Sequence, residues 1–206
     1  MYSLKFIKHR PILRSDLKKI LKWRNNSKIR NKMLNNKIIR FAEHKKWFEN
    51  LKKNKQSEAF IFLYNKEDVG YGIINEIDRH NKTCTWGMYL DPKYINSGLG
   101  VLIEIYTIER IFSHHKIRKV WGDALSSNHD ILNIHKMFGF SVEGVFKKQI
   151  IKNNIYQDVV RVSHTDTEKK MKHLGKEIER SVLHKAVKAH LDYKVITYNN
   201  KTIVFK

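Results

Sequence analysis

A histidine lies in the middle of an otherwise apolar helical face in the stretch NHDILNIHKMFGF, residues 128–140. Asn128 is typical of a helix N-cap, and Gly139 is typical of the residue that follows a helix. One face of this helix carries Ile131, Ile134, His135 and Phe138, which recur at helical spacing. Because histidine titrates near neutral pH, His135 is either satisfied in the core or faces a cavity where protons move. Spacing alone favours the core.

A loop with two glycines precedes another predicted helix. It reads INSGLG at residues 95–100 and follows a strand that ends at Leu90. Glycine allows a ligand to approach the backbone closely, and the free N–H groups of a helix N-terminus can hold a phosphate or pyrophosphate. The loop has no Lys-Ser/Thr pair and does not complete G-x-G-x-x-G, so an ordinary helix entry stays open as the alternative.

A sheet must position these two stretches. Apolar periodicity predicts helices at residues 15–26, 27–34, 42–53, 99–112 and 128–138, and strands at residues 3–9, 58–65, 69–77, 83–90, 117–125, 140–151 and 155–162. The three strands between residues 58 and 90 predict an antiparallel meander, and the last two strands predict a hairpin. This order is typical of an α+β domain with a mixed sheet.

The chain of 206 residues is long enough for one domain and an appendage. We expect the domain at residues 1–164 and a C-terminal extension at residues 165–206. In the extension Met171, Leu174, Ile178 and Val182 mark a basic amphipathic helix, and the last residues predict a hairpin that turns at Asn199-Asn200. The extension is a candidate surface for self-association or for binding a partner.

The positive charge is concentrated at the N-terminal end. Residues 1–55 hold 18 Lys and Arg against 3 Asp and Glu, a net charge of +15, whereas residues 56–163 have a net charge of +1 and residues 164–206 a net charge of +5. The abundance of Lys, Asn and Ile also fits a codon bias that decorates a solvated surface. Either origin gives a surface that attracts anions.

Other sequence features concern the compartment. No stretch approaches 18 consecutive apolar residues, and the N-terminus lacks the apolar run of a secretory signal. The single cysteine, Cys84, excludes an internal disulfide framework and favours a reducing compartment. We therefore expect a cytoplasmic protein without a transmembrane segment.

The segment order and the glycine loop together resemble the GNAT superfamily of acetyl-CoA-dependent N-acetyltransferases. The loop of that family reads Arg/Gln-x-x-Gly-x-Gly/Ala, and here both glycines match while Ile95 replaces the leading polar residue. Three more stretches resemble GNAT enzymes of the pseudaminic-acid pathway, namely ILKWRNN, EHKKWFENL and NHDILNIHKMFGFSVEGVFKKQIIKNNIYQDVVRVS. The resemblance covers roughly residues 4–164 and implies a GNAT-like acyl-CoA N-acyltransferase fold with a C-terminal helix-plus-hairpin extension.

The resemblance implies acetyl-CoA as the cofactor and no metal. The strand end Met88–Leu90 is expected to pair with the pantetheine arm, which Asn128 also contacts, and the glycine loop is expected to hold the pyrophosphate. His135 stands where many GNAT enzymes place a tyrosine that protonates the CoA sulfur. The implied cofactor-binding residues are Met88, Tyr89, Leu90, Ile95, Asn96, Ser97, Gly98, Leu99, Gly100, Asn128, Ile131 and His135.

The resemblance also implies the acceptor, the 4-amino group of a UDP-linked 4-amino-4,6-dideoxy-N-acetyl-altrosamine. The product feeds a nonulosonic acid that decorates flagellin or a surface polysaccharide. The charge of residues 1–55 agrees with an anionic acceptor, since it would repel a polyamine. Arg24 can offer a planar fork to a diphosphate. Further acceptor candidates are Trp23, Met33, His44, Trp47 and Trp86, with core packing as the alternative for each tryptophan.

The implied mechanism is direct transfer in a ternary complex. A backbone N–H near Leu90 is expected to bind the developing oxyanion, which is worth ~3 kcal/mol in the transition state. His135 supplies the proton to the sulfur, and Glu76 is the candidate base through a water molecule, or an ion-paired surface residue. Asp78, His80 and Asp91 are rival bases. Cys84 lies mid-strand without a matched base and is expected to be structural.

Two other functions stay open. A GNAT enzyme could acetylate another amine, such as the N-terminus of a ribosomal protein. A non-catalytic protein could instead bind nucleic acid or a membrane surface through residues 1–55 and the basic extension. Against nucleic acid, the aromatic residues are not interleaved as a stacking platform, so we expect a UDP-amino sugar as the partner and no nucleic acid.

Overall fold

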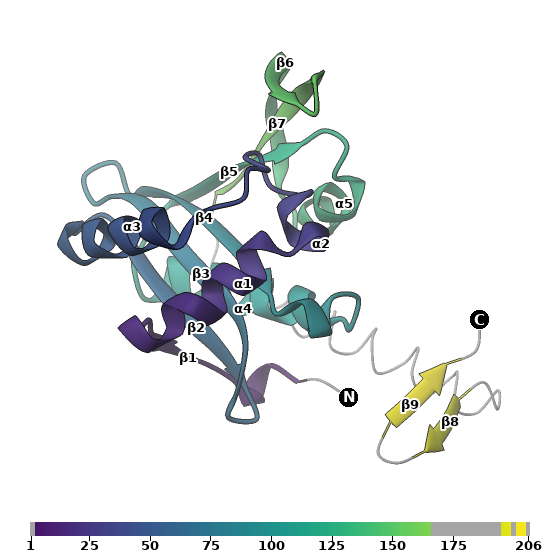
Figure 1. Ribbon diagram of the computed structural model, residues 1–206. Helices are drawn as coiled ribbons and strands as arrows, with labels where there is room; N and C mark the ends of the chain where they lie inside the picture. Colours follow the sequence, from purple (N-terminus) through teal and green to yellow (C-terminus); the bar gives the residue numbers. More distant parts are fainter. Residues whose placement is uncertain (1–2, 166–194, 199–200, 205–206) are drawn as a thin grey trace.

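The structure, a computed structural model, describes residues 3–165, 195–198 and 201–204. Its centre is a seven-stranded sheet with the order β1-β2-β3-β4-β5-β7-β6 (Figure 1). The strands are β1 (Ile7–Pro11), β2 (Glu58–Tyr64), β3 (Glu67–Asp78), β4 (Thr83–Leu90), β5 (Lys119–Leu125), β6 (Ser141–Lys152) and β7 (Ile155–Thr165). Only β4 and β5 are parallel neighbours. The mixed sheet and the meander β2-β3-β4 confirm the predicted architecture.

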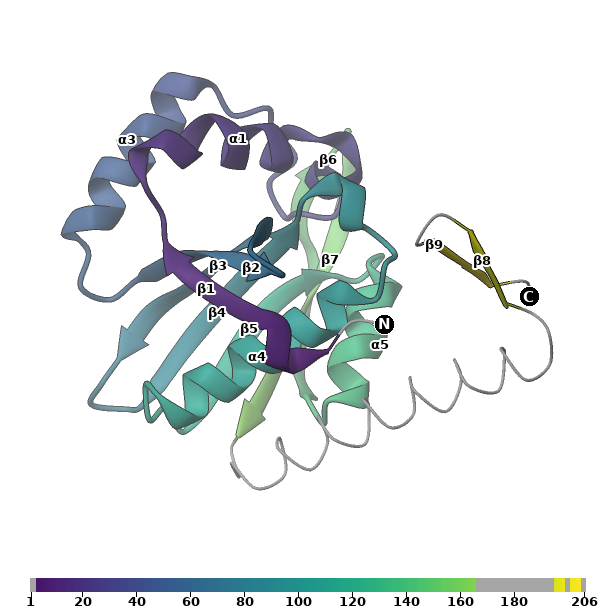
Figure 2. The ribbon, with the colours of Figure 1, turned by 90° about the horizontal axis from the view of Figure 1, so that it is seen from below.

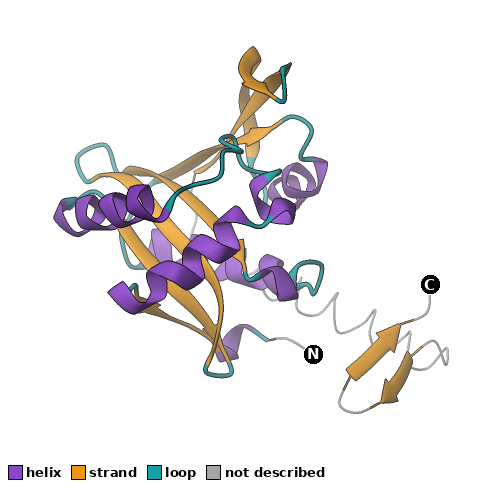
Figure 3. Ribbon diagram, viewed as in Figure 1, coloured by secondary structure: helices purple, strands orange, loops and turns teal. Residues whose placement is uncertain are grey.

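Helices cover both faces of the sheet (Figures 2 and 3). On one face lie α1 (Leu17–Asn25) and α3 (Phe41–Lys53), and on the other lie α4 (Leu99–Ser113) and α5 (His129–Met137). α4 connects the parallel strands β4 and β5, a pairing that always needs such a crossover. The short helices are α2 (Ser27–Arg30) and three 3₁₀ turns at Leu4–Phe6, Arg14–Asp16 and Pro92–Tyr94.

Two apolar clusters fill the space between the sheet and the helices. The larger one joins the sheet to α4 and α5, and Trp86, Met88 and Leu90 of β4 pack against it. The smaller one contains residues of α1 and α2, and Tyr89 of β4 packs against it. Side chains therefore alternate between the two faces along β4. This alternation decides which residues of β4 lie on which side of the site.

Several predicted boundaries shift in the structure. The first strand begins at Ile7 rather than at residue 3, because a 3₁₀ turn occupies Leu4–Phe6. The helix predicted at residues 27–34 ends at Arg30. Beyond its end, the Asn31 and Met33 carbonyl oxygens accept hydrogen bonds from Lys152 Nζ at 2.6 and 2.9 Å. A side chain from β6 thus takes carbonyl groups that a longer helix would have used.

The C-terminal extension is described only in part. β8 (Val195–Tyr198) pairs antiparallel with β9 (Lys201–Val204), and Tyr198 lies opposite Lys201. This pairing confirms the predicted terminal hairpin. The predicted amphipathic helix lies outside the described residues, and the boundary after residue 164 stays a prediction. Among the described helices, none combines the length and apolar character that a membrane span requires.

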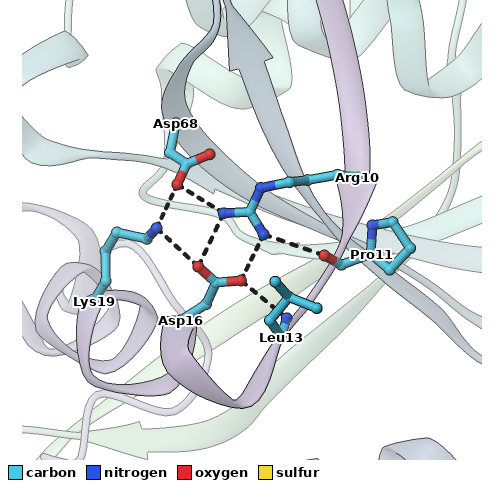
Figure 4. A network of polar contacts seen from close by, with 6 residues as sticks. All are labelled: Arg10, Pro11, Leu13, Asp16, Lys19 and Asp68. Carbon is cyan, nitrogen blue, oxygen red and sulfur yellow. Dashed lines mark hydrogen bonds and ion pairs between the residues drawn. The ribbon is translucent and has the colours of Figure 1, made fainter.

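An ionic network fixes the start of α1 on the sheet (Figure 4). The Arg10 guanidinium of β1 donates two hydrogen bonds to Asp16, at 2.6 and 2.9 Å, and one to Asp68 of β3 at 2.7 Å. Lys19 of α1 donates to both carboxylates. Asp16 stands at the N-cap of α1, and its carboxylate accepts a hydrogen bond from the Leu13 amide.

The network holds Asp16 ionised. Burial by itself would raise the pKa of this carboxyl, but hydrogen bonds from Arg10, the Leu13 amide and Lys19 lower the pKa below its ordinary value. The same two cations lower the pKa of Asp68 against the effect of burial. A native pKa below that of the unfolded chain means that ionisation of these carboxyls stabilises the fold.

Replacing Asp16 by Asn is expected to lower the free energy of unfolding by about 2 kcal/mol at pH 7, because buried charge-assisted hydrogen bonds are lost. The same exchange at Asp130, whose side chain is 84% exposed beside Lys32, is the matched control and should cost at most about 1 kcal/mol. Urea denaturation followed by circular dichroism measures both values.

The effect should also depend on pH. The stabilisation by Asp16 is complete above the unfolded pKa of about 4 and is lost as the pH falls through the lower native pKa. The difference in stability between the wild type and D16N should therefore stay constant from pH 7 down to about pH 4 and shrink only as the pH falls further. Equal stability of D16N and D130N at pH 7 would contradict this account.

Candidate functional site

The sheet opens between its two parallel strands. β4 pairs with β5 only through Thr83–Thr85, opposite Lys119–Trp121. Beyond Thr85, β4 continues to Leu90 along β3 alone. β5 likewise continues to Leu125 along β7 alone. The carboxyl ends of β4 and β5 thus diverge, and we call the space between them the splay.

Backbone groups of β4 line the splay. The Asp91 amide donates to the Val69 carbonyl at 2.8 Å, so the opposite residues Leu90 and Gly70 form a non-hydrogen-bonded pair. In such pairs the N–H and C=O groups point away from the partner strand, and every second residue shares this orientation. Leu90 and Met88 therefore direct their backbone groups away from β3 and toward the splay. Tyr89 bonds to β3 and stacks its ring on Tyr71 at 4.9 Å.

The glycine loop leads into α4 beside the end of β4. Gly98 has φ of +84°, which favours glycine, and a Cβ at this position would meet nothing within 4 Å. A Cβ on Gly100 would lie 3.6 Å from the Leu90 side chain, which places the helix start next to the splay. Ile95 instead packs against the smaller apolar cluster. The loop therefore has the open backbone that the sequence predicts, but its leading residue, Ile95, packs into the smaller apolar cluster.

α5 brings the predicted proton donor to the same face as α4. Asn128 stands at the N-cap, as predicted, but its side chain makes no capping hydrogen bond. His135 is 6% exposed, and Ile131 lies half-buried one turn before it. Within the described residues, His135 Nδ1 is a buried nitrogen without a hydrogen-bond partner. Such an orphaned group calls for an explanation in a native fold.

A buried carboxylate that the sequence reasoning missed lies beside this histidine. Glu104 of α4 is 1% exposed, and its Oε1 accepts a hydrogen bond from Trp86 Nε1 at 3.0 Å. His135 Nε2 lies 3.4 Å from the same oxygen. The available signal was an acid in the apolar run LIEIY of a predicted helix, since a buried charge needs partners.

Trp86 does not lie with the other acceptor candidates. It packs on the α4 side of β4, and a Cβ on Gly122 of β5 would lie 3.0 Å from its ring. Its indole therefore bridges β4 and β5 where the splay begins. Trp86 is, like Trp23 and Trp47, a predicted acceptor candidate, but the structure places it on the opposite face of the sheet from those two residues, because side chains alternate along β4.

The other acceptor candidates gather on the opposite face. Trp23 is buried in the smaller apolar cluster, and Met33 and Trp47 pack against that cluster. His44 is buried and stacks on Trp47 at 4.9 Å between ring centres. Burial lowers the pKa of His44 and so favours its neutral form. Core packing explains Trp23 fully, whereas Met33 and Trp47 keep partial exposure.

Three cations meet on this face without a carboxylate, and we call Arg24, Arg30 and Lys152 the cation cluster. Arg24 donates to the Asn35 carbonyl at 2.6 Å and Arg30 to the Asn36 carbonyl at 2.8 Å. Arg24 Nη1 and Arg30 Nε are buried and have no partner among the described residues. Among residues 3–165, none of the three cations forms an ion pair.

The cations of this cluster repel one another. Burial and then the charges of Arg24, Arg30 and Lys32 lower the pKa of Lys152. Burial also lowers the pKa of Arg24, and its charge interacts with Tyr89 of β4. The cluster therefore lies beside β4 and carries uncompensated positive charge. Such a site attracts an anion.

The candidate bases differ in whether neighbouring groups already bind them. Glu76 is exposed, has φ of +52°, and lies where the pairing of β3 with β4 shifts register. Its charge helps to raise the pKa of Arg161, which is dominated by the hydrogen bonds to Asp123. The rivals are engaged locally, since Asp78 accepts from Asn81 and Asp91 accepts from the Lys93 amide.

Cys84 is fully buried in the larger apolar cluster. Burial raises the pKa of its thiol to about 12. Because the thiolate is the nucleophile, a thiol held neutral in the core cannot carry an acetyl group in turnover. The structure thus agrees with the predicted structural role of Cys84.

Comparison with known proteins connects this geometry to a family. Residues 10–160 match the acetyltransferase (GNAT) domain. Acetyltransferase PseH of Campylobacter jejuni subsp. jejuni serotype O:23/36 (strain 81-176) is 23% identical over 127 residues, which cover 62% of this chain and 78% of that protein. The family match covers most of the chain and includes β4, the glycine loop and α5.

A second group of relatives matches a short segment. Formyltetrahydrofolate deformylase of Bacillus subtilis (strain 168) is 55% identical over 51 residues, which are 25% of this chain and 17% of that protein. The chain spans only 17% and 18% of the lengths of the first two deformylases it matches.

A solved structure shares the fold. Spermidine N-acetyltransferase from Vibrio cholerae, crystallised in complex with CoA and spermine, has a TM-score of 0.75 and 18% identity, and the likeness covers 81% of this chain and 98% of that chain. At this identity the likeness concerns the architecture alone. With the GNAT domain matched over residues 10–160 and this architecture around the splay, the chain belongs to the GNAT acetyltransferases, which use acetyl-CoA as the acetyl donor.

Proposed function

We propose that this acetyltransferase acetylates the 4-amino group of a UDP-linked 4-amino-4,6-dideoxy sugar. The observation that carries the proposal is the cation cluster beside β4, in which two buried guanidinium N–H groups have no partner among the residues that the structure describes. A diphosphate supplies the acceptor oxygens and negative charge that this cluster lacks. The resemblance of the stretches ILKWRNN and EHKKWFENL to GNAT enzymes of the pseudaminic-acid pathway supports the same acceptor class.

A polyamine acceptor fits the charges less well. The spermidine N-acetyltransferase that shares the fold is a structure with bound spermine, a polycation. Here the three residues Arg24, Arg30 and Lys152 already repel one another. A polycation would add to that repulsion, whereas a nucleotide sugar would relieve it.

The splay fits acetyl-CoA, which when bound supplies a thioester carbonyl that an amine can attack. The backbone N–H and C=O groups of Met88 and Leu90 would hold the amides of the pantetheine arm. The open amides near Gly98 at the start of α4 would hold the pyrophosphate. The Asn128 side chain, which caps nothing, is available to the pantetheine arm.

Three residues of the chain would stabilise charge or move protons during the transfer. An N–H of Leu90 would stabilise the negative charge that develops on the carbonyl oxygen, and His135 would give a proton to the leaving sulfur. Glu76 would take the proton from the attacking amine through a water molecule. Each step moves one proton, and no acetyl group resides on the protein.

The acceptor is tested by incubating the protein with acetyl-CoA and one amine at a time, while thiol release is followed. The amines are the UDP-4-amino sugar, spermidine and a basic peptide. We expect turnover of the UDP-sugar, with a KM that rises as salt screens the attraction. Turnover of spermidine or the peptide without turnover of the UDP-sugar would overturn the proposal.

Arg24→Gln and Arg30→Gln test the cation cluster in the same assay. Each should raise the KM for the UDP-sugar about tenfold, since a hydrogen bond to a charged group contributes roughly 1.5 kcal/mol or more. The KM for acetyl-CoA should not change. Arg14→Gln is the matched control, because Arg14 is 67% exposed and pairs with Glu49. Equal effects of all three exchanges would contradict the assignment.

His135→Gln should lower kcat by about 10²–10⁴-fold, the usual contribution of a general acid, and leave the KM for acetyl-CoA nearly unchanged. His129→Gln on the same helix is the control, since His129 is exposed. Steady-state kinetics at saturating acceptor measure both. An unchanged kcat in His135→Gln would show that His135 is a core residue without a role in proton transfer.

Direct transfer predicts that Cys84→Ala keeps its initial rate, although the cavity lowers the free energy of unfolding by about 1 kcal/mol. Mass spectrometry of the protein mixed with acetyl-CoA alone should show no added acetyl group. Acetylation that disappears in Cys84→Ala would establish an acyl-enzyme and refute direct transfer.

A further inference from the structure

Glu104 occupies a place where the fold would accept an apolar residue. It lies on the buried face of α4, and the neighbouring residues Ile103 and Ile105 belong to the larger apolar cluster. A carboxylate in such surroundings costs free energy unless it is paired and hydrogen-bonded. Its side chain is 2% exposed, so water cannot supply the partners. The reason for this acid must lie in the groups that it contacts.

Two side chains reach the same carboxylate oxygen. Trp86 of β4 donates its indole N–H to Oε1 at 3.0 Å, and His135 of α5 places Nε2 at 3.4 Å from it. The ring of His135 also lies 5.3 Å from the ring of Trp86 and 5.0 Å from that of Phe140. The carboxylate thus joins β4, α4 and α5 at one atom.

This contact leaves His135 with one nitrogen in use and one without a partner. Nε2 faces Glu104, whereas Nδ1 is buried and unpaired among the described residues. Another titratable side chain, His164 of β7, lies against Phe140 with 5.3 Å between the ring centres. Glu104 is therefore the charged group that is placed to select which nitrogen of His135 keeps its proton.

We propose that Glu104 is a positioning residue, which fixes the orientation and the tautomer of the His135 ring for the proton transfer of the acetyl-transfer reaction. The proposal rests on the proton-donor role given to His135 in the proposed function. The carboxylate stabilises the protonated ring through Nε2. When the protonated ring gives up one proton, that proton goes to the lone pair of the leaving sulfur, and the ring stays neutral.

Trp86 fixes the position of the same carboxylate. Its indole lies over Gly122 at the start of the splay, and its N–H holds Oε1 in place. The carboxylate therefore keeps its direction while the ring of His135 changes charge. In the same way, the aspartate of a Ser-His-Asp triad orients the catalytic imidazole and does not itself transfer a proton.

Glu104→Gln tests the proposal, because it keeps the size of the side chain and an oxygen for Trp86 but removes the charge. We expect kcat to fall about 100-fold, at the lower end of a general-acid contribution, with the KM for acetyl-CoA unchanged. Glu109→Gln is the matched control on the same helix, since Glu109 is partly exposed and forms no ion pair among the described residues. Unchanged kcat in Glu104→Gln would overturn the proposal.

The double variant Glu104→Gln/His135→Gln separates positioning from a merely structural role. If Glu104 acts through His135, the double variant should have the same kcat as His135→Gln alone. If the losses in kcat of the two single variants multiply in the double variant, Glu104 acts independently of His135. That result would overturn the proposal. The assay uses the UDP-sugar or, if that is not turned over, spermidine, so a wrong acceptor does not decide the result.

Nitrogen-15 NMR of the histidine-labelled protein gives a readout that does not depend on activity. His135→Gln identifies the signals of His135. In the wild type we expect the neutral ring to carry its proton on Nε2, and in Glu104→Met, which removes the acceptor, the tautomers should mix. An identical tautomer in Glu104→Met and the wild type would overturn the proposal, even if His135→Gln is inactive.

Discussion

After Thr85 the strand β5 no longer pairs with β4, and the backbone groups of Met88 and Leu90 face an opening instead of a neighbouring strand. Main-chain donors and acceptors that are withdrawn from water need partners, so this opening suits a ligand that carries amides of its own. The alternation of β4 then sorts the side chains. Trp86 turns toward α4 and α5, and Tyr89 turns toward α1 and the cation cluster.

The two sides of β4 differ in the sign of the charge beside them. On the α4 side the carboxylate of Glu104 lies next to a histidine, and on the α1 side Arg24, Arg30 and Lys152 form no ion pair among residues 3–165. An anion is favoured on one side and a protonated imidazole on the other. A reaction in which an anionic acceptor takes the acetyl group while the leaving sulfur takes a proton can use both fields at once.

Local sequence patterns predicted the elements that depend on interactions between residues close together in the chain. The glycine loop, the strand β4 and the helix that carries His135 follow from turn residues and periodicity. Partners far apart in the sequence were not predictable in this way. Lys152 lies 121 residues from Asn31, yet its ammonium group binds the Asn31 carbonyl at the end of the helix that begins at Ser27. Glu104 was overlooked for the same reason, since its partners come from β4 and α5.

The opening beside β4 has a consequence for how such chains diverge. Peptide groups are the same whatever side chain they carry, so a ligand that is read by the main chain places few demands on residue identity. The loop at residues 95–100 illustrates this tolerance, since Ile95 packs into a neighbouring cluster where relatives of the resembled family carry Arg or Gln. Drift to 23% identity with PseH is compatible with a shared architecture. Under the proposed function, selection for a particular acceptor would act instead on the side chains of the α1 face.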